Sequence, residues 1–404
     1  MNNTYIAITL LSLTVSSFAV GADWLQFRGP NGASVTGDVA PPTKWSETEN
    51  VAWASDLPGK GVSGPIVVQG RIYLTCASGE KQDRLHVLCF DEKSGDEVWH
   101  REFWATGRTL THPFSSVAAP TPASDGKRIF AFFSSNDLAC LDLDGNLLWY
   151  RGLAFDYPKA GNDIGMASSP VVTGETVVVQ LENQGDSFAA ALDTASGETR
   201  WRVDRDHSAN WVSPTALPGK REGKHVVLLQ GRSGLTAHDA MSGDELWRYD
   251  VPCSTTPSVA VSETRIYIPA NGLTVLDLPK DATVPSLAWD SSQLSPSPAS
   301  PIVTKDFVYV MNGVGVLSCG DIVTGKRLWQ VRIGGRHWAT PVVAGNLMYC
   351  INADGEVKVV ELGERGKVVG TNKFDEAVKG SPATAAGALY VRTDSKLWKI
   401  ARGS

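Results

Sequence analysis

CFDEKSGDEVW, at residues 89–99, follows the pattern small residue-x-Asp-x-x-Ser/Thr-Gly-x-x-x-Trp. The pattern returns at residues 191–201, 237–247 and 319–329, and a copy shortened by one residue occupies residues 140–149. Copies at intervals of roughly 40 to 50 residues indicate a repeat architecture, which determines the fold class. The recurring residues are Asp91, Gly95 and Trp99, Asp142, Gly145 and Trp149, Asp193, Gly197 and Trp201, Asp239, Gly243 and Trp247, and Asp321, Gly325 and Trp329.

A second motif recurs with the same period as the first: each unit begins with Ser/Thr-Pro or a near copy of it. Two short apolar runs separated by a turn follow each marker, as residues 302–303 and 307–310 show in the sixth unit. Such runs, rich in β-branched and aromatic residues and bounded by Gly, Asp and Asn, predict antiparallel strands. The eight marker prolines are Pro65, Pro120, Pro170, Pro214, Pro257, Pro301, Pro341 and Pro382.

The Trp motif suits the hairpin between the last two strands of a unit. Asp can accept hydrogen bonds from the N–H groups of the turn, and Gly supplies the positive φ of a bulged turn. Trp on the outermost strand can fill the wedge between neighbouring sheets, and its indole N–H needs a carbonyl if buried. A four-stranded unit repeated radially is a β-propeller blade.

The eighth unit lacks a fourth strand, since the chain ends shortly after the run at residues 396–400. An additional strand with its own Trp53 is predicted at residues 50–54, before the first marker. We therefore expect an all-β, eight-bladed β-propeller of four-stranded antiparallel blades, closed by pairing of its N- and C-terminal strands and formed by residues 22–404 as one domain. Seven blades is the alternative, because units five and seven have weak last strands.

Residues 1–21 carry no charged side chain and contain an apolar run. They resemble a secretory signal peptide, so we expect a periplasmic or secreted protein with no membrane span after its removal. A retained anchor is the alternative. No Cys follows the apolar run before Cys76, so we do not expect a lipoprotein. The net charge of -6 argues against nucleic acid or an anionic membrane as the partner.

Six cysteines in an exported chain raise the question of disulfides. Cys89, Cys140 and Cys319 occupy the motif position that Ala191 and Ala237 fill in other units, which predicts buried small side chains. A bridge between Cys76 and Cys89 is the alternative. No Cys-x-x-Cys is present, which excludes zinc-ribbon and thioredoxin-type motifs.

The Trp motif resembles the tryptophan-docking motif of pyrroloquinoline quinone (PQQ) propeller repeats. Quinoprotein alcohol dehydrogenases share these repeats with the non-catalytic, BamB-like propeller of outer-membrane protein assembly. Residues 23–32, DWLQFRGPNG, and His112-Pro113 resemble exported, planctomycete-type members. The adjacent cysteines of the dehydrogenases are absent, and no motif places their calcium ligands here. We therefore expect no cofactor, with PQQ and calcium as the alternative.

Loops between one blade and the next converge around the channel of a propeller and can carry function. We expect these loops to bring three histidines to one rim as a polar pocket, or less favourably a metal site of His and Asp ligands. Trp211 and Trp338 would line or plug the channel. The candidate binding residues are Arg108, His112, Arg205, His207, Trp211, Arg336, His337 and Trp338.

No catalytic residue is predicted, because Gly-x-Ser-x-Gly, a Walker-type loop and His-Glu-x-x-His are all absent. The fold does not determine function, which depends on the site. The sequence favours an exported, non-catalytic scaffold that binds an envelope protein or an extracellular polymer. The alternative is a PQQ- or quinone-dependent oxidoreductase acting on alcohols or sugars.

Overall fold

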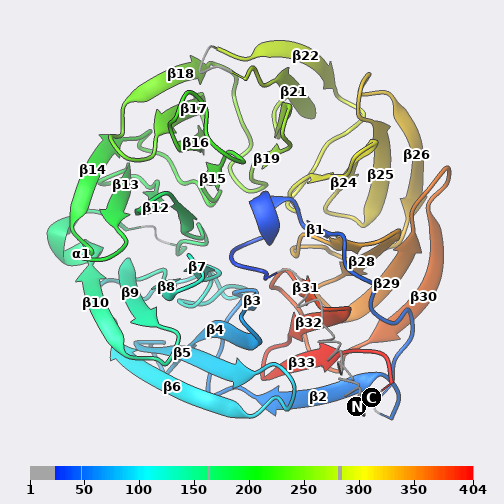
Figure 1. The fold of residues 1–404 in the computed structure, drawn as a ribbon, viewed down its shortest axis with the longest axis horizontal. Helices are drawn as coiled ribbons and strands as arrows, with labels where there is room; N and C mark the ends of the chain where they lie inside the picture. The colour runs from blue at the N-terminus through cyan, green and yellow to red at the C-terminus, as the bar shows by residue number, and fades with distance from the viewer. Residues whose placement is uncertain (1–22, 47, 162–163, 281–283, 404) are drawn as a thin grey trace, which may run out of the picture.

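The computed structural model describes residues 23–46, 48–161, 164–280 and 284–403, so the predicted signal peptide lies outside the described residues. Eight sheets, each built on an antiparallel meander, stand around a central axis, one after another in chain order (Figure 1). The prediction of an eight-bladed, all-β propeller is confirmed, and the seven-bladed alternative is wrong. In the described residues, no helix has the length and apolar character needed to cross a membrane.

The first four blades follow the predicted order of an inner strand, two middle strands and an outer strand. Blade 1 contains β3 (Ile66–Val68), β4 (Arg71–Ser78), β5 (Arg84–Asp91) and β6 (Glu97–Trp104); blade 2 contains β7 (Ala123–Ser124), β8 (Arg128–Phe132), β9 (Asp137–Asp142) and β10 (Leu147–Gly152); blade 3 contains β11 (Val171–Thr173), β12 (Thr176–Leu181), β13 (Phe188–Asp193) and β14 (Thr199–Asp204); blade 4 contains β15 (Thr215–Ala216), β16 (Val226–Gly231), β17 (Gly234–Asp239) and β18 (Glu245–Tyr249).

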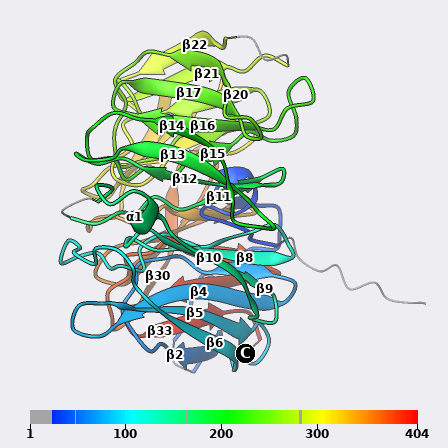
Figure 2. The ribbon, with the colours of Figure 1, turned by 90° about the vertical axis from the view of Figure 1, so that its left-hand side faces the viewer.

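The remaining blades include the two units whose last strands are weak in sequence. Blade 5 contains β19 (Ala260–Val261), β20 (Arg265–Ile268), β21 (Leu273–Asp277) and β22 (Ser286–Ser291); blade 6 contains β23 (Ile302–Val303), β24 (Phe307–Met311), β25 (Val316–Asp321) and β26 (Arg327–Arg332); blade 7 contains β27 (Val342–Ala344), β28 (Leu347–Ile351), β29 (Glu356–Glu361) and β30 (Lys367–Lys373); blade 8 contains β31 (Ala383–Ala385), β32 (Ala388–Arg392) and β33 (Lys396–Ile400). A short helix, α1 (Leu153–Asp156), follows blade 2 and lies on the surface (Figure 2).

Two N-terminal strands complete the ring. The strand β2 (Val51–Asp56) pairs antiparallel with β33 as the outer strand of blade 8, which confirms the predicted closure. The strand β1 (Val35–Thr36) was not expected, and it pairs parallel with β27 at the inner edge of blade 7. Blade 7 is therefore five-stranded. The N-terminal segment thus binds two successive blades, and β2 joins the ends of the propeller.

The core lies between blades rather than inside them, because each sheet buries both of its faces against a neighbour. One apolar cluster joins Leu74 of blade 1 to Tyr390 of blade 8 and Tyr349 of blade 7. Another joins Leu228 of blade 4 to Ile266 of blade 5. Burial on both faces explains why the middle strands are continuous apolar runs instead of alternating ones.

The motif Trp side chains connect successive blades. The indole N–H of Trp99 in blade 1 donates to the carbonyl of Leu143 in blade 2 at 2.9 Å. Trp201 of blade 3 repeats this contact with Ala240 of blade 4 at 2.8 Å. Trp53 of β2 donates to Glu92 in blade 1 at 3.2 Å, so the contact also crosses the closure of the ring.

The motif Asp and Gly shape the turn that receives each Trp. The Oδ1 atom of Asp91 accepts the N–H groups of Lys93 and Ser94, both at 2.9 Å. Gly145 has φ +82°, and a Cβ there would lie 2.6 Å from the ring of Trp99. Gly therefore provides both the left-handed turn and the space in which the Trp of the preceding blade sits.

All six cysteines are buried and unpaired. Cys89, Cys140 and Cys319 are fully buried, as predicted. Cys76 lies opposite His86 and Cys89 lies opposite Tyr73, so the alternative of a Cys76–Cys89 bridge is wrong. Burial raises the pKa of the Cys89 thiol to about 12, which keeps it protonated and unreactive.

Candidate ligand-binding cavity at the propeller axis

The N-terminal segment closes one end of the central channel. Trp24 exchanges backbone hydrogen bonds with Val67 of blade 1 at 2.8 and 2.9 Å. Four residues later, the guanidinium of Arg28 donates to the carbonyl of Val259 near blade 5, at 2.8 Å. The segment therefore crosses the axis, and its 3-10 turn, η1 (Pro30–Gly32), lies near the centre of the ring, drawn in blue in Figure 1. Phe27 lines the cavity above it.

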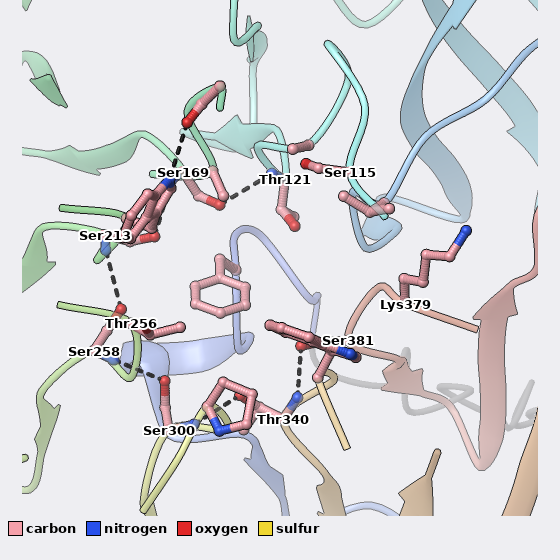
Figure 3. Close-up of a pocket in the computed structure, with 18 of the residues that line it drawn as sticks. Ser115, Thr121, Ser169, Ser213, Thr256, Ser258, Ser300, Thr340, Lys379 and Ser381 are labelled. Carbon is pink, nitrogen blue, oxygen red and sulfur yellow. Dashed lines mark hydrogen bonds between the residues drawn. The ribbon is translucent and has the colours of Figure 1, made fainter. Parts of the chain in front are cut away.

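A ring of hydroxyl side chains forms the wall of the cavity (Figure 3). Each hydroxyl oxygen accepts a backbone N–H from the preceding blade, as when Ser213 Oγ accepts from Ser169 at 2.9 Å. The same bond is repeated from blade to blade around the axis, and the last one runs from Thr340 N–H to Ser381 Oγ at 3.0 Å. The ring consists of Thr121, Ser169, Ser213, Ser258, Ser300, Thr340 and Ser381. These bonds tie the inner edges of successive blades together.

Gly64 occupies the eighth position of the ring. Its N–H donates to Thr121 Oγ1 at 2.9 Å, but it offers no hydroxyl to the last blade. A Cβ at Gly64 would lie 2.5 Å from the carbonyl oxygen of Ser381, so a side chain here would collide with blade 8. The ring therefore has a gap where the first and last blades meet.

The hydroxyl ring explains why most units begin with Ser/Thr-Pro. In blades 2 and 5, the marker proline does not directly follow the ring hydroxyl. Ser169, Ser213 and Thr340 each directly precede a marker proline, so the hydroxyl in Ser/Thr-Pro was the available signal. In blade 2 the ring hydroxyl is Thr121, which precedes Pro122 rather than Pro120. In blade 5 it is Ser258, which follows Pro257 and precedes Val259. The repeated feature is the hydroxyl, and the proline accompanies it in most blades.

The cavity has a volume of about 450 Å³ and opens among loops that connect successive blades. His112, Trp211 and Trp338 line it, as three of the predicted site residues. The indole N–H of Trp211 donates to the carbonyl of Gly165 at 2.9 Å, which fixes that ring beside the neighbouring loop. Trp338 is 49% exposed. The two Trp side chains therefore border the cavity instead of plugging it.

Two loops meet across the mouth of the cavity. The guanidinium carbon of Arg336, from the loop after β26, lies 5.8 Å from the centroid of the Phe114 ring, from the loop after β6. The Nδ1 atom of His112 accepts the N–H of Phe114 at 3.2 Å. The neutral His112 ring therefore carries its proton on Nε2.

The other predicted site residues do not line the cavity. The Nε of Arg205 donates to buried Glu182 at 2.7 Å between blades 3 and 4. His207 is exposed and bonds the carbonyl of Gly185. His337 is buried, with ring nitrogens 3.1 and 2.8 Å from the carbonyls of Ile351 and Gly334. Arg108 is exposed on the loop after β6.

The expectation that three histidines converge in one pocket is therefore wrong. His112 alone among the described residues brings an imidazole to the cavity. His337 was misplaced because its loop turns inward at Gly334 and Gly335, both with positive φ, and buries the ring against backbone. Within the described parts of the chain, no three His, Cys, Asp or Glu side chains form a group that could hold a metal ion.

The chain matches a family of known proteins along most of its length. The family model described as outer membrane protein assembly factor BamB matches residues 31–185, 163–267 and 269–364. The chain belongs to this family of PQQ-like propellers. The resemblance inferred from the Trp motif is thereby confirmed, while the planctomycete-type origin stays a prediction.

Relatives of this BamB-family propeller include both kinds of protein that share the repeat. It is 24% identical over 328 residues to BamB of Moranella endobia (strain PCIT), covering 76% of this chain and 77% of the relative. The crystal structure of BamB from Moraxella catarrhalis matches with a TM-score of 0.66 at 17% identity, covering 87% and 97% of the two chains. A europium-containing methanol dehydrogenase matches with a TM-score of 0.69 at 14% identity, covering 93% and 90%. These structural matches show the fold alone.

The described cavity lining of this BamB-family propeller lacks the ligands that PQQ and calcium would require. Calcium takes several oxygen ligands, most of them carboxylates or carbonyls. The described residues that line the cavity include no Asp, Glu or Cys, and their titratable groups are His112 and Lys379. The Nζ of Lys379 is itself paired with Asp394 at 3.0 Å. The described lining therefore does not fit a calcium-bound quinone.

Three buried histidines predict how the stability of this propeller depends on pH. Burial is the largest influence on the pKa of His86, His238 and His337, and it lowers each below the ordinary value. The unfolded chain binds protons at these sites more readily than the folded chain, so their contribution to stability is complete above about pH 6.5 and is lost as pH falls through the folded pKa values.

We therefore expect the urea concentration at the midpoint of unfolding to fall when the pH is lowered from 7.5 to 5. His238→Gln should reduce that fall, because the ring of His238 donates to Gly243 and stacks on Trp201 in a neutral form. His207→Gln, which replaces an exposed ring, serves as the control and should leave the fall unchanged. Equal pH profiles for wild type and His238→Gln would contradict the assignment.

Proposed function

We propose that this chain is an exported, non-catalytic propeller that binds a protein of the cell envelope across the face on which the cavity opens. The observation that supports this proposal most is a band of exposed apolar side chains on two loops of that face. Phe155 of α1 is 85% exposed, Trp104 58%, Phe114 55% and Leu110 50%. We call these four residues the rim band. Exposed apolar side chains grouped on neighbouring segments are typical of interaction sites on soluble proteins.

The two loops that carry the rim band lie against each other. The hydroxyl of Tyr150 donates to the carbonyl of Trp104 at 3.2 Å, which joins the ends of the outer strands β6 and β10. The N–H of His112 donates to the carbonyl of Ile164 at 3.0 Å farther in. A Cβ on Gly107 would lie 2.7 Å from the Cβ of Ala154 in α1. The band thus has a hydrogen-bonded scaffold beneath it and offers a preformed docking surface.

The chemistry of the rim band favours a protein partner. Trp and Phe side chains are typical anchors at the centre of protein interfaces, where they fill pockets of the partner. The family match supports an envelope protein in particular, because its model describes an outer membrane protein assembly factor. An oxidoreductase is less well supported, since the described cavity lining does not fit the cofactor.

The test uses photo-crosslinking in cells that produce the protein. A benzophenone amino acid at Leu110 should crosslink one envelope protein reproducibly. Phe155→Ser should reduce the yield of this crosslink about tenfold or more, because serine cannot fill the pocket of the partner that the phenyl ring would occupy. Leu287 supplies the matched control, because it is 52% exposed on the outer strand of blade 5. Neither a crosslinker at Leu287 nor Leu287→Ser should have these effects.

Two results would reject the proposal. One is equal crosslinking of the same protein from positions 110 and 287, which would indicate a nonspecific surface. The other is recovery of an envelope polysaccharide in place of a protein, which would assign the surface to a polymer. Reduction of a dye by the purified protein with alcohol or sugar donors and added PQQ would favour the dehydrogenase alternative.

A further inference from the structure

The hydroxyl ring leaves hydrogens without a partner inside the cavity. Each ring oxygen accepts a backbone N–H, so the hydroxyl hydrogen is the remaining donor of that side chain. Ser258, Ser300 and Thr340 are only 2%, 3% and 3% exposed, and the described part of the chain offers no acceptor to their hydroxyl hydrogens. A wall with unused donors is suited to a ligand that supplies acceptor oxygens.

The charges around the cavity also favour an acceptor. The described lining contains Lys379 and His112 but no carboxylate, so it has no group to neutralise a cation. Beneath the floor, Arg28 is 3% exposed, and its Nε and Nη1 atoms have no hydrogen-bond partner. Its Nη2 atom reaches the backbone carbonyl of Val259. The described lining is thus poor in acceptors and has the buried cation of Arg28 beneath it, whereas Lys379 is already paired with Asp394.

The remaining lining is apolar. Phe27 contributes to the floor side and Phe114 to the mouth, while Trp211 and Trp338 come from loops on different sides of the ring. Cavities of a few hundred Å³ with mostly apolar walls and a few placed polar groups are typical of small-molecule sites. The ligand should therefore combine an apolar body with one acceptor group at its end.

We propose that the cavity binds an aliphatic carboxylate, whose carboxylate oxygens accept hydrogen bonds from the Ser258–Ser300–Thr340 arc of the ring and whose chain lies among the aromatic side chains at the mouth. Hydroxyl donors form short, charge-assisted bonds to a carboxylate, which offset part of its desolvation. A flexible chain suits walls whose aromatic rings come from separate blades. This site shares only Phe114 with the rim band and needs no protein partner.

Octanoate, octanamide and octylamine form a probe series with one apolar body and three head groups. We expect calorimetry on the purified protein to show octanoate binding at least about tenfold more tightly than octanamide, with no detectable heat from octylamine. The amide retains an acceptor oxygen but lacks the charge, and the amine presents a cation to a wall without carboxylates. Equal affinities for the three probes, or no octanoate binding, would overturn the proposal.

Thr340 allows a matched pair of variants. Thr340→Val removes the hydroxyl at similar volume and should weaken octanoate binding about tenfold, whereas Thr340→Ser keeps the hydroxyl and should bind like wild type. Thermal unfolding of both variants controls for loss of the bond from Ser300 N–H to Thr340 Oγ1, 3.1 Å long. Phe155→Ser should leave octanoate binding unchanged, which separates this site from the rim band. Equal affinities of folded Thr340→Val and Thr340→Ser would reject the assignment.

Discussion

Gly145→Ala is expected to lower the free energy of unfolding by about 3 kcal/mol, the sum of backbone strain and overpacking. Gly145 has φ +82°, and its Cβ would lie 2.6 Å from the ring of Trp99. That ring cannot retreat freely, because its N–H is bonded to the carbonyl of Leu143 in the same turn. The new methyl group therefore pushes blade 1 away from blade 2 at their outer edges.

Gly126→Ala is the matched control in the same blade. Gly126 also has φ +82°, but a Cβ there would meet nothing within 4 Å. Its replacement should cost about 1 to 2 kcal/mol, from backbone strain alone. Urea unfolding followed by Trp fluorescence measures both variants. If the two variants lost the same stability, the Trp contact would contribute nothing beyond the turn, and the inter-blade role of the motif would be wrong.

The contact between Gly145 and Trp99 also shows why the fold was predictable from the sequence. Each blade needs the same tight turn and the same side chain to fill the wedge-shaped space beside the neighbouring sheet, so the same residues recur at similar spacing. The closure by β2 was predictable for a related reason, since an unpaired strand and an incomplete blade need one another. The partner of Trp99 was not predictable, because the motif does not specify which blade receives the ring.

The candidate site was less predictable, because its residues depend on contacts between distant segments. Phe27 enters the cavity only because the N-terminal segment crosses the axis, and nothing local in residues 23–32 specifies that path. His112 and Trp338 could be predicted as site residues because they lie in loops between successive blades. His337 and Arg205 have the same polarity and loop position, but they contact acceptors inside the protein. Loop membership alone does not distinguish a lining residue from a buried structural one.

Arg205 belongs to a buried ion pair whose disruption should produce the other large effect. The side chain of Glu182 is completely buried and that of Arg205 is 9% exposed. The Oε1 atom of Glu182 accepts from Arg205 Nε and Gln180 Nε2, both at 2.7 Å, and Oε2 accepts from Asn210 Nδ2 at 2.8 Å. Removing the carboxylate leaves the guanidinium of Arg205 buried without its counter-charge, while Gln180 and Asn210 keep only their bonds to the carbonyl of Gln230.

Glu182→Ala is therefore expected to destabilise the protein by about 3 to 5 kcal/mol. Glu175→Ala is the control, because Glu175 is 76% exposed where it pairs with Arg200 at 3.2 Å, and its loss should cost less than about 1 kcal/mol. Combining Glu182→Ala with Arg205→Met should recover part of the loss, since the double variant no longer buries an uncompensated charge. Urea midpoints of Glu182→Ala, Glu175→Ala, Arg205→Met and the double variant test this reasoning. A double variant less stable than Glu182→Ala by the full cost of Arg205→Met alone would show that the two charges are not coupled, and the ion pair would then have no part in joining blades 3 and 4.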